Sequence, residues 1–162
     1  MESSWPDMGT WPKYPSNCDE ASLAISATNW AAPADRPQRS LQVAIAAARV
    51  AHENKGQDIV LLDLRELTAV FDFFIVVTGT SSRQLHAIAD EIKTTLAEKF
   101  GEKRLGMEGY AAGTWILQDY GDVVIHLFDE KAREYYSLEQ LWSDARRVDW
   151  EAPPAPRIAK TE

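Results

Sequence analysis

The pattern of apolar and polar positions divides the chain into one patterned segment and two tails. Between residues 40 and 150, apolar residues recur either at alternate positions or at intervals of three and four, which are the periods of strands and helices. Residues 1–39 and 151–162 follow neither period and hold proline-rich stretches. We therefore predict a domain at 40–150, an N-terminal extension that is flexible or loosely packed, and a Pro-rich C-terminal tail.

Helical periods occur in three places within the predicted domain. Ser40 can cap a helix whose apolar stripe runs to Gly56, and Ser81 can cap a second helix whose stripe runs to Gly101. Ser81 and Ser137 each begin the pattern Ser-x-x-Gln, which is a capping box because the hydroxyl and the amide both bind free backbone N–H groups. We expect the third helix, after Ser137, to be short.

Strand patterns fill the rest of the domain. Residues 58–65 and 71–80 form apolar runs, and residues 115–128 form two apolar segments around a turn. The run at 71–80 is almost entirely apolar, so we expect a central strand that is covered on both faces. The order of elements predicts a fold of the α/β or α+β class, with a mixed sheet of four to five strands flanked by helices.

The hairpin at 115–128 contains two aspartates and a histidine, which raises the question of an acid–base pair. If residues 120–121 form the turn, Asp119 pairs with Asp122 and Trp115 lies opposite His126. The aspartates then lie about four residue pairs from His126, at about 3.3 Å per residue, beyond hydrogen-bond reach. We therefore expect Asp119 and Asp122 to be turn residues, and His126 to lie beside Trp115 in the sheet.

The loop at 78–82 joins a strand to a helix and is a candidate phosphate site. Thr80, Ser81 and Ser82 lie where free N–H groups and the helix dipole can hold a phosphate. Nucleotidyltransferases have a Gly-Ser turn at this position, but they also need a carboxylate pair such as Asp-x-Asp on the next strand to hold metal ions. No such pair occurs in a downstream strand. An ordinary helix cap is favoured, and a nucleotide-binding or nucleotidyltransferase-like enzyme is the alternative.

Composition narrows the classes of partner and cofactor. The formal net charge is −8, from 17 Lys+Arg and 25 Asp+Glu, which argues against direct nucleic-acid binding and favours a basic protein as partner. Cys18 is the single cysteine and the three histidines lie in separate elements, so we expect no disulfide, metal or other cofactor. Neither a bilayer-crossing run nor a secretory signal is evident, so we expect a cytoplasmic protein.

A series of motifs follows in unbroken order between Leu41 and Val148. They are Gly56-Gln57-Asp58, FDFFIVVTGTSSRQ, AIADEI, Glu108-Gly109, GTWILQDYGDVVIHLF, Arg133 and Tyr136-x-Leu138-Glu139-x-Leu141-Trp142-x-Asp144-Ala145. In this combination the chain resembles the ribosomal silencing factor family, also called the Iojap family. The N-terminal extension and the C-terminal tail lie outside the resemblance.

The resemblance implies a protein that is not an enzyme and that binds the large ribosomal subunit through large-subunit ribosomal protein fourteen. Such factors sterically block joining of the small subunit and repress translation when nutrients are limiting. The resemblance also implies a nucleotidyltransferase-like fold without the catalytic carboxylates, and homodimers occur in the family.

The same resemblance locates the expected partner contacts. Trp115 and Asp119 match the Trp and Asp of the family's W-[IV]-[LV]-x-D strand, and residues 108–109 match its E-G pair. An aromatic residue on one face of an apolar hairpin is a typical interface anchor, and acidic neighbours suit a basic ribosomal protein. The predicted partner-binding residues are Glu108, Gly109, Trp115, Leu117, Asp119 and His126.

Two alternatives remain open from the sequence alone. Trp115 could be buried under a helix rather than exposed to a partner, since tryptophan is highly buried on average. The protein could also be an adaptor that dimerises through its sheet and binds an unrelated partner.

Overall fold

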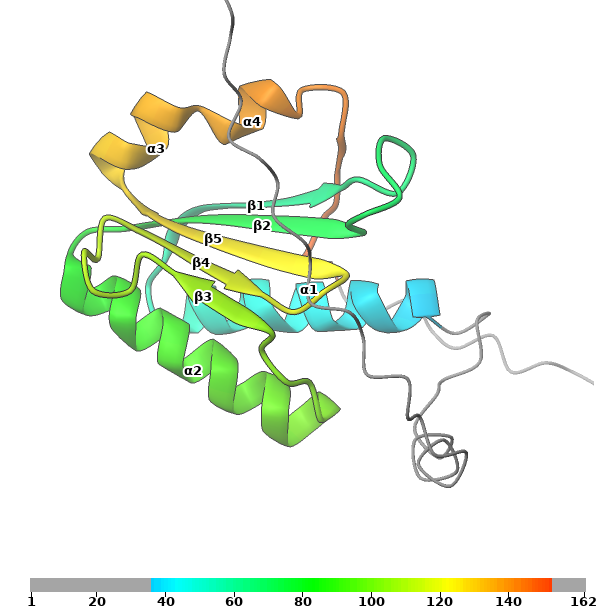
Figure 1. The fold of residues 1–162 in the computed structure, drawn as a ribbon, viewed down its shortest axis with the longest axis horizontal. Coiled ribbons are helices and arrows are strands. Elements are labelled where there is room, and N and C mark those ends of the chain that lie inside the picture. The colour runs from blue at the N-terminus through cyan, green and yellow to red at the C-terminus, as the bar shows by residue number, and fades with distance from the viewer. Residues whose placement is uncertain (1–35, 153–162) are drawn as a thin grey trace, which may run out of the picture. The chain divides into compact units, whose positions relative to one another are not determined.

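A computed structural model describes residues 36–152, which form one sheet with helices on both faces (Figure 1). The elements in chain order are α1 (Arg36–Glu53), β1 (Gln57–Asp63), β2 (Phe73–Gly79), α2 (Ser82–Phe100), β3 (Gly106–Glu108), β4 (Trp115–Asp119), β5 (Val123–Asp129), α3 (Glu130–Tyr136), α4 (Leu138–Leu141) and β6 (Arg146–Arg147). The predicted N-terminal extension lies almost wholly outside the described residues, as does most of the C-terminal tail.

The sheet has the strand order β3-β4-β5-β2-β1-β6. Strands β2 and β5 pair in parallel, and the other four neighbouring pairs are antiparallel. The predicted class, a mixed sheet flanked by helices, is confirmed. The sheet has six strands instead of four to five, because β3 and β6 contain three and two residues and are too short to show a period.

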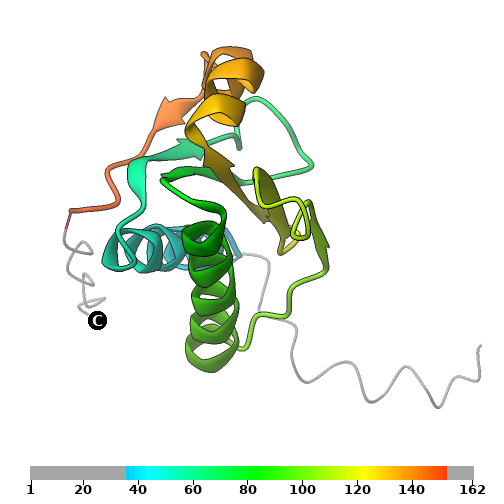
Figure 2. The ribbon, with the colours of Figure 1, turned by 90° about the vertical axis from the view of Figure 1, so that its left-hand side faces the viewer.

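The main core lies between the sheet and helices α1 and α2, which both cover the same face (Figures 1 and 2). All seven residues of β2 are buried, as expected for a central strand covered on both faces. The apolar stripe of α2 from Leu85 to Leu96 is buried against the sheet. Each large aliphatic side chain that is fully buried there contributes about 1.5–3 kcal/mol to the free energy of folding.

Helices α3 and α4 lie on the opposite face and cover only part of it (Figure 1). A smaller apolar cluster beneath them joins β1, β2 and β5 through Leu62, Phe74 and Val124. Trp142 and Leu117 pack at its margin and are half-buried. The β4 side of this face therefore keeps side chains that a partner can reach.

The three predicted helix starts have different outcomes. Ser81 caps α2 as expected, because its Oγ accepts a hydrogen bond from the N–H of Gln84 at 3.2 Å. Ser40 does not cap α1, which begins four residues earlier at Arg36; its Oγ instead donates to Asp72 Oδ2 at 2.7 Å. Ser137 makes no side-chain cap for α4, because its Oγ donates back to the carbonyl oxygen of Glu134 at 2.6 Å.

Candidate partner-binding surface

The β4–β5 hairpin turns one residue later than predicted. Asp119 lies opposite Val124 and the N–H of Tyr120 bonds to the carbonyl of Val123 at 3.0 Å, so residues 121–122 form the tip. The carboxylate of Asp119 accepts a hydrogen bond from the N–H of Gly121 at 2.7 Å, which fixes this turn. Asp119 is therefore the last residue of β4 and not a turn residue as predicted, whereas Asp122 lies in the turn as expected; the Asp119 side chain is half-buried.

This later turn moves the strand register by two residues. Trp115 lies opposite Phe128 and Leu117 lies opposite His126, so the predicted pairing of Trp115 with His126 is wrong. A shift of two leaves every side chain on its original face, whereas a shift of one would exchange the faces. Trp115 therefore still shares a face with His126, while residues 116 and 125 point into the main core as predicted.

Trp115 is half-buried within a group of aromatic rings. Its ring stacks on Phe128 with centroids 5.0 Å apart and lies 4.6 Å from the ring of Tyr136 on α3. Next to Tyr136, the side chain of Tyr135 is 82% exposed. We call Trp115, Phe128, Tyr135 and Tyr136 the aromatic patch; Phe128 is fully buried beneath it, and the other three reach the surface. Trp115 is neither a fully buried core residue nor an isolated surface residue.

His126 lies beneath the aromatic patch and is 4% exposed. Burial lowers the pKa of its imidazole to about 4, because a charged ring is poorly solvated among apolar neighbours. The ring of Phe74 forms a T-shaped pair with it, with 4.9 Å between centroids, and the indole Nε1 of Trp115 donates to its Nδ1 at 3.4 Å. Its burial leaves little imidazole surface for a partner to touch directly.

Glu108 and Gly109 lie beside this face at the end of β3. Glu108 is exposed and pairs with Leu117 across the β3–β4 ladder, so it borders the same sheet face as Trp115. Gly109 has φ +74, and a Cβ added to it would overlap the carbonyl oxygen of Trp115. The backbone can pass this close to β4 only because residue 109 is glycine.

The structure therefore gathers the predicted partner-binding residues along β3, β4 and β5, and adds neighbours that the sequence did not single out. Phe128 lies two residues beyond His126 on the same face, a position that the strand period could have revealed. Tyr136 reaches Trp115 from α3. No local pattern reveals that contact, because it depends on where the helix packs.

The loop with Thr80, Ser81 and Ser82 is engaged by its own helix. Gln84 Oε1 accepts a hydrogen bond from the N–H of Thr80 at 2.8 Å and another from its hydroxyl at 3.0 Å. A cleft of about 720 Å³ beside the loop is lined by four carboxylates, Asp58, Asp129, Glu130 and Glu134, and by Lys131 and Arg133. The acidic surplus and the occupied N–H favour a helix cap over a phosphate site.

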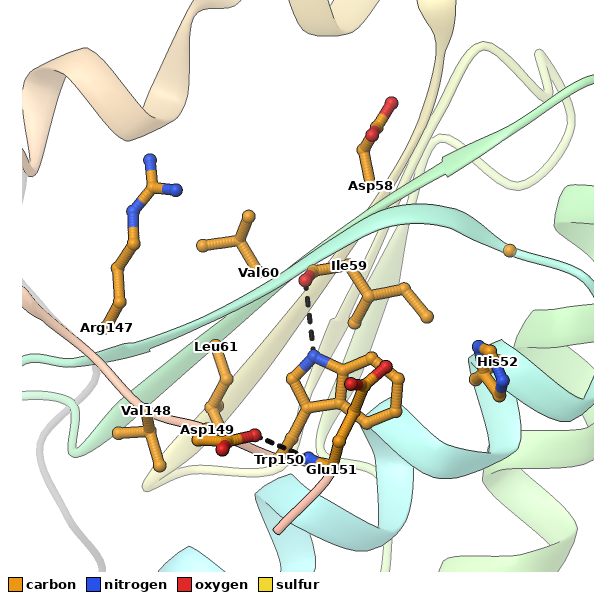
Figure 3. Close-up of a pocket in the computed structure, with 11 residues that line it drawn as sticks. His52, Asp58, Ile59, Val60, Leu61, Arg147, Val148, Asp149, Trp150 and Glu151 are labelled. Atoms are coloured by element: carbon orange, nitrogen blue, oxygen red, sulfur yellow. Dashed lines mark hydrogen bonds between the residues drawn. The ribbon is translucent and has the colours of Figure 1, made fainter.

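A second hollow, of about 440 Å³, opens beside the outer edge of β1 (Figure 3). The indole of Trp150 donates to the carbonyl oxygen of Ile59 at 3.3 Å and lies 5.3 Å from the ring of His52. Asp58 and Asp149 also line this hollow. None of the predicted site residues lies here, and the Trp150 side chain occupies a hydrogen-bonding position of the strand edge.

Within residues 36–152 no group of three or more His, Cys, Asp and Glu side chains is arranged to hold a metal ion. In the same range no helix has both the length and the apolar character that a membrane crossing requires.

Comparison with known proteins gives matches over most of the chain. The family model described as "Ribosomal silencing factor during starvation" matches residues 37–162. The ribosomal silencing factor RsfS of Halalkalibacterium halodurans is 39% identical over 114 residues, which are 70% of this chain and 94% of that protein. The "Mitochondrial assembly of ribosomal large subunit protein 1" of Mus musculus is 29% identical over 113 residues, 68% of this chain and 49% of that protein. A crystal structure from Chromobacterium violaceum is similar with a TM-score of 0.59 at 36% identity, covering 75% of this chain and 98% of that one.

Proposed function

The chain belongs to the ribosomal silencing factor family, and on this basis we propose that it binds the large ribosomal subunit and blocks joining of the small subunit. The contact is made with large-subunit ribosomal protein fourteen. Occupying that surface represses translation under nutrient limitation. The proposed action is steric, so no bond is made or broken and the protein is not an enzyme.

One observation supports the proposed binding surface above the others. The half-buried Trp115 packs against Phe128 and Tyr136 within the aromatic patch, on a sheet face that α3 and α4 leave partly open. Large, rigid aromatic side chains that are already packed on one side lose little entropy when a partner covers the other side. Exposed Glu108 lies next to this patch, and the net charge of −8 suits a basic ribosomal protein.

Sedimentation tests the proposal directly. The full chain is mixed with isolated bacterial large subunits and centrifuged through sucrose, and we expect it to sediment with them. When small subunits are then added, the fraction of joined ribosomes should fall as the protein concentration rises. The proposal is wrong if the protein stays at the top of the gradient, or if subunits join normally while it is bound.

The alternative, a nucleotide-binding or nucleotidyltransferase-like enzyme, has a simple test of its own. Because Gln84 already binds the N–H of Thr80, we expect nucleoside triphosphates with Mg²⁺ to leave the melting temperature unchanged. A clear upward shift would indicate binding to the folded state and would favour the enzyme.

We expect the protein to act in the cytoplasm, where bacterial ribosomes are, and fractionation of cells would test this. A homodimer of the free protein is a further proposal, which light scattering coupled to size exclusion would test by giving the molar mass in solution.

A further inference from the structure

His126 occupies a buried position among aromatic rings, where an apolar side chain would be the ordinary choice. It is 4% exposed. The ring of Phe74 packs against it in a T-shaped arrangement, with 4.9 Å between centroids. The ring of Phe128 lies nearly parallel to it, with 9° between the planes and 6.1 Å between centroids. A phenylalanine could make the same contacts without bringing two nitrogen atoms into an apolar environment.

The hydrogen bond from Trp115 determines which nitrogen of His126 carries the proton. An indole N–H can only donate, so Nδ1 of His126, at 3.4 Å, must be unprotonated. A neutral ring then carries its hydrogen on Nε2. That atom is buried and has no hydrogen-bond partner among residues 36–152. An unpaired buried donor lowers stability, so we expect histidine at this position to stabilise the fold less than phenylalanine would.

The hydrogen bond between Trp115 and His126 can be useful for binding even though the unpaired Nε2–H lowers the stability of the fold. Stacking on Phe128 fixes the plane of the Trp115 ring. Stacking alone does little to fix which edge of the indole points inward within that plane. The Nε1–H is the single polar group of the indole, and its bond to His126 selects one edge of the ring to face the interior. The opposite edge of the indole ring then faces outward, toward a partner that covers the aromatic patch.

We propose that His126 is a positioning residue of the partner-binding surface: it does not touch the partner, but fixes the indole of Trp115 in the orientation that the partner meets. This inference rests on the proposed function, because it assigns His126 a role at the same surface. It predicts that the acceptor atom at residue 126 matters for binding more than the volume of the ring does.

Two substitutions separate the acceptor from the ring. His126→Phe keeps an aromatic ring and removes the acceptor. His126→Asn loses the ring, but its amide oxygen can occupy the place of Nδ1 and accept from Trp115. We expect His126→Phe to unfold at the same or a higher urea concentration than the unsubstituted protein, since it removes the unpaired Nε2–H, and we expect His126→Asn to be less stable.

Binding to isolated large ribosomal subunits should show the reverse order. One hydrogen bond corresponds to a change of roughly three- to tenfold in affinity, so His126→Phe should bind about that much more weakly. Under conditions where it is fully folded, His126→Asn should bind within about twofold of the unsubstituted protein. Equal binding by His126→Phe, or a loss confined to His126→Asn, would show that His126 acts through packing alone and would overturn the proposal.

A measurement without any partner decides the positioning step separately. In a ¹H–¹⁵N spectrum the indole N–H signal of Trp115, identified by its disappearance in Trp115→Phe, should exchange slowly with water. In His126→Phe it should exchange faster and move upfield. The same exchange rate in both proteins would overturn the proposal. If the unsubstituted protein binds no large subunit, the proposed function fails, and the exchange result alone then decides whether His126 positions Trp115.

Discussion

At the scale of the residue, Trp115 carries the proposed contact, and the packing around it determines what its removal should do. Its side chain is half-buried, with Phe128 and Tyr136 against it. We predict that Trp115→Ala weakens binding to large subunits by more than tenfold, as truncation of an aromatic interface anchor does. Because the residue is outside the fully buried core, the variant should lose only about 1–3 kcal/mol of folding free energy and remain folded.

A matched control for Trp115→Ala is Trp150→Ala, another half-buried tryptophan, which lies beside β1 and not in the aromatic patch. Co-sedimentation and the circular dichroism spectrum of both variants would be compared. Equal loss of binding in the two variants would point to general destabilisation. Unfolding of Trp115→Ala alone would make Trp115 a core residue.

Two glycines allow a second prediction at this scale. Gly109 and Gly101 have similar positive φ values of +74 and +66, but a Cβ would overlap the carbonyl oxygen of Trp115 only at Gly109, whereas the space at Gly101 is open. Alanine at a positive φ costs about 1 kcal/mol from the backbone alone. We predict that Gly101→Ala loses about that much, and that Gly109→Ala loses roughly 2–4 kcal/mol because the backbone of β4 must also move.

Urea unfolding of the two alanine variants would give both free energies on the same scale. Similar losses would mean that the connection between β3 and β4 adapts without strain, and that the close approach of Gly109 to Trp115 does not constrain the partner-binding surface.

At the scale of the element, Arg133 attaches α3 to the sheet. Its guanidinium donates to the hydroxyl of Thr78 at 2.7 Å, to the carbonyl of Asp58, and to both oxygens of Glu139 at 2.8 and 3.2 Å. The side chain is only 13% exposed. Since α3 supplies Tyr136 to the aromatic patch, the position of this helix affects the proposed surface as well as the stability of the fold.

We predict that Arg133→Met lowers the free energy of unfolding by roughly 2–4 kcal/mol, because it leaves Glu139 without its partner in a largely buried place. Amide hydrogen exchange should increase most in α3 and α4. Arg39→Met is the control, since Arg39 pairs with Glu102 at a site where 44% of its side chain is exposed, and it should lose less than about 1 kcal/mol. Unchanged exchange in α3 would contradict the prediction.

The elements also show how far the sequence determines the fold. The long periods of α1 and α2 and the apolar run of β2 could be predicted because each buries many residues in one repeating pattern. The hairpin register could not, since Asp119 stabilises a turn one residue later than the one expected. Ser40 could not be assigned either, because its hydroxyl bonds to Asp72 across the fold and not to its own helix.

At the scale of the whole molecule, acidification tests the buried imidazole of His126. Its pKa in the folded protein is about 4, below the ordinary value of 6.5. Between about pH 6.5 and pH 4 the imidazole of His126 therefore binds a proton more readily in the unfolded chain than in the folded protein. The stability that the neutral imidazole contributes is fully present above about pH 6.5 and is lost as the pH falls toward about 4. We predict a loss of roughly 2 kcal/mol between about pH 7 and pH 5.

His126→Phe should remove most of this pH dependence. The buried carboxylate of Asp63 should not interfere with this comparison, because Arg65 lowers its pKa below the ordinary value of 3.8. The stability that Asp63 contributes is therefore lost only at a pH below the range compared. Urea unfolding at the two pH values would measure the difference. The same loss in both proteins would assign it to groups other than His126.

The parallel pairing of β2 with β5 has a consequence for how the chain folds as it is made. Phe73 pairs with Val123, and the intervening chain includes α2 and the β3–β4 pair. The closure of such a long loop slows folding. During synthesis β2 emerges well before β5, so the central pair of the sheet forms only after Asp129 has left the exit tunnel. The surface proposed to bind ribosomes therefore forms only when most of the chain has been translated.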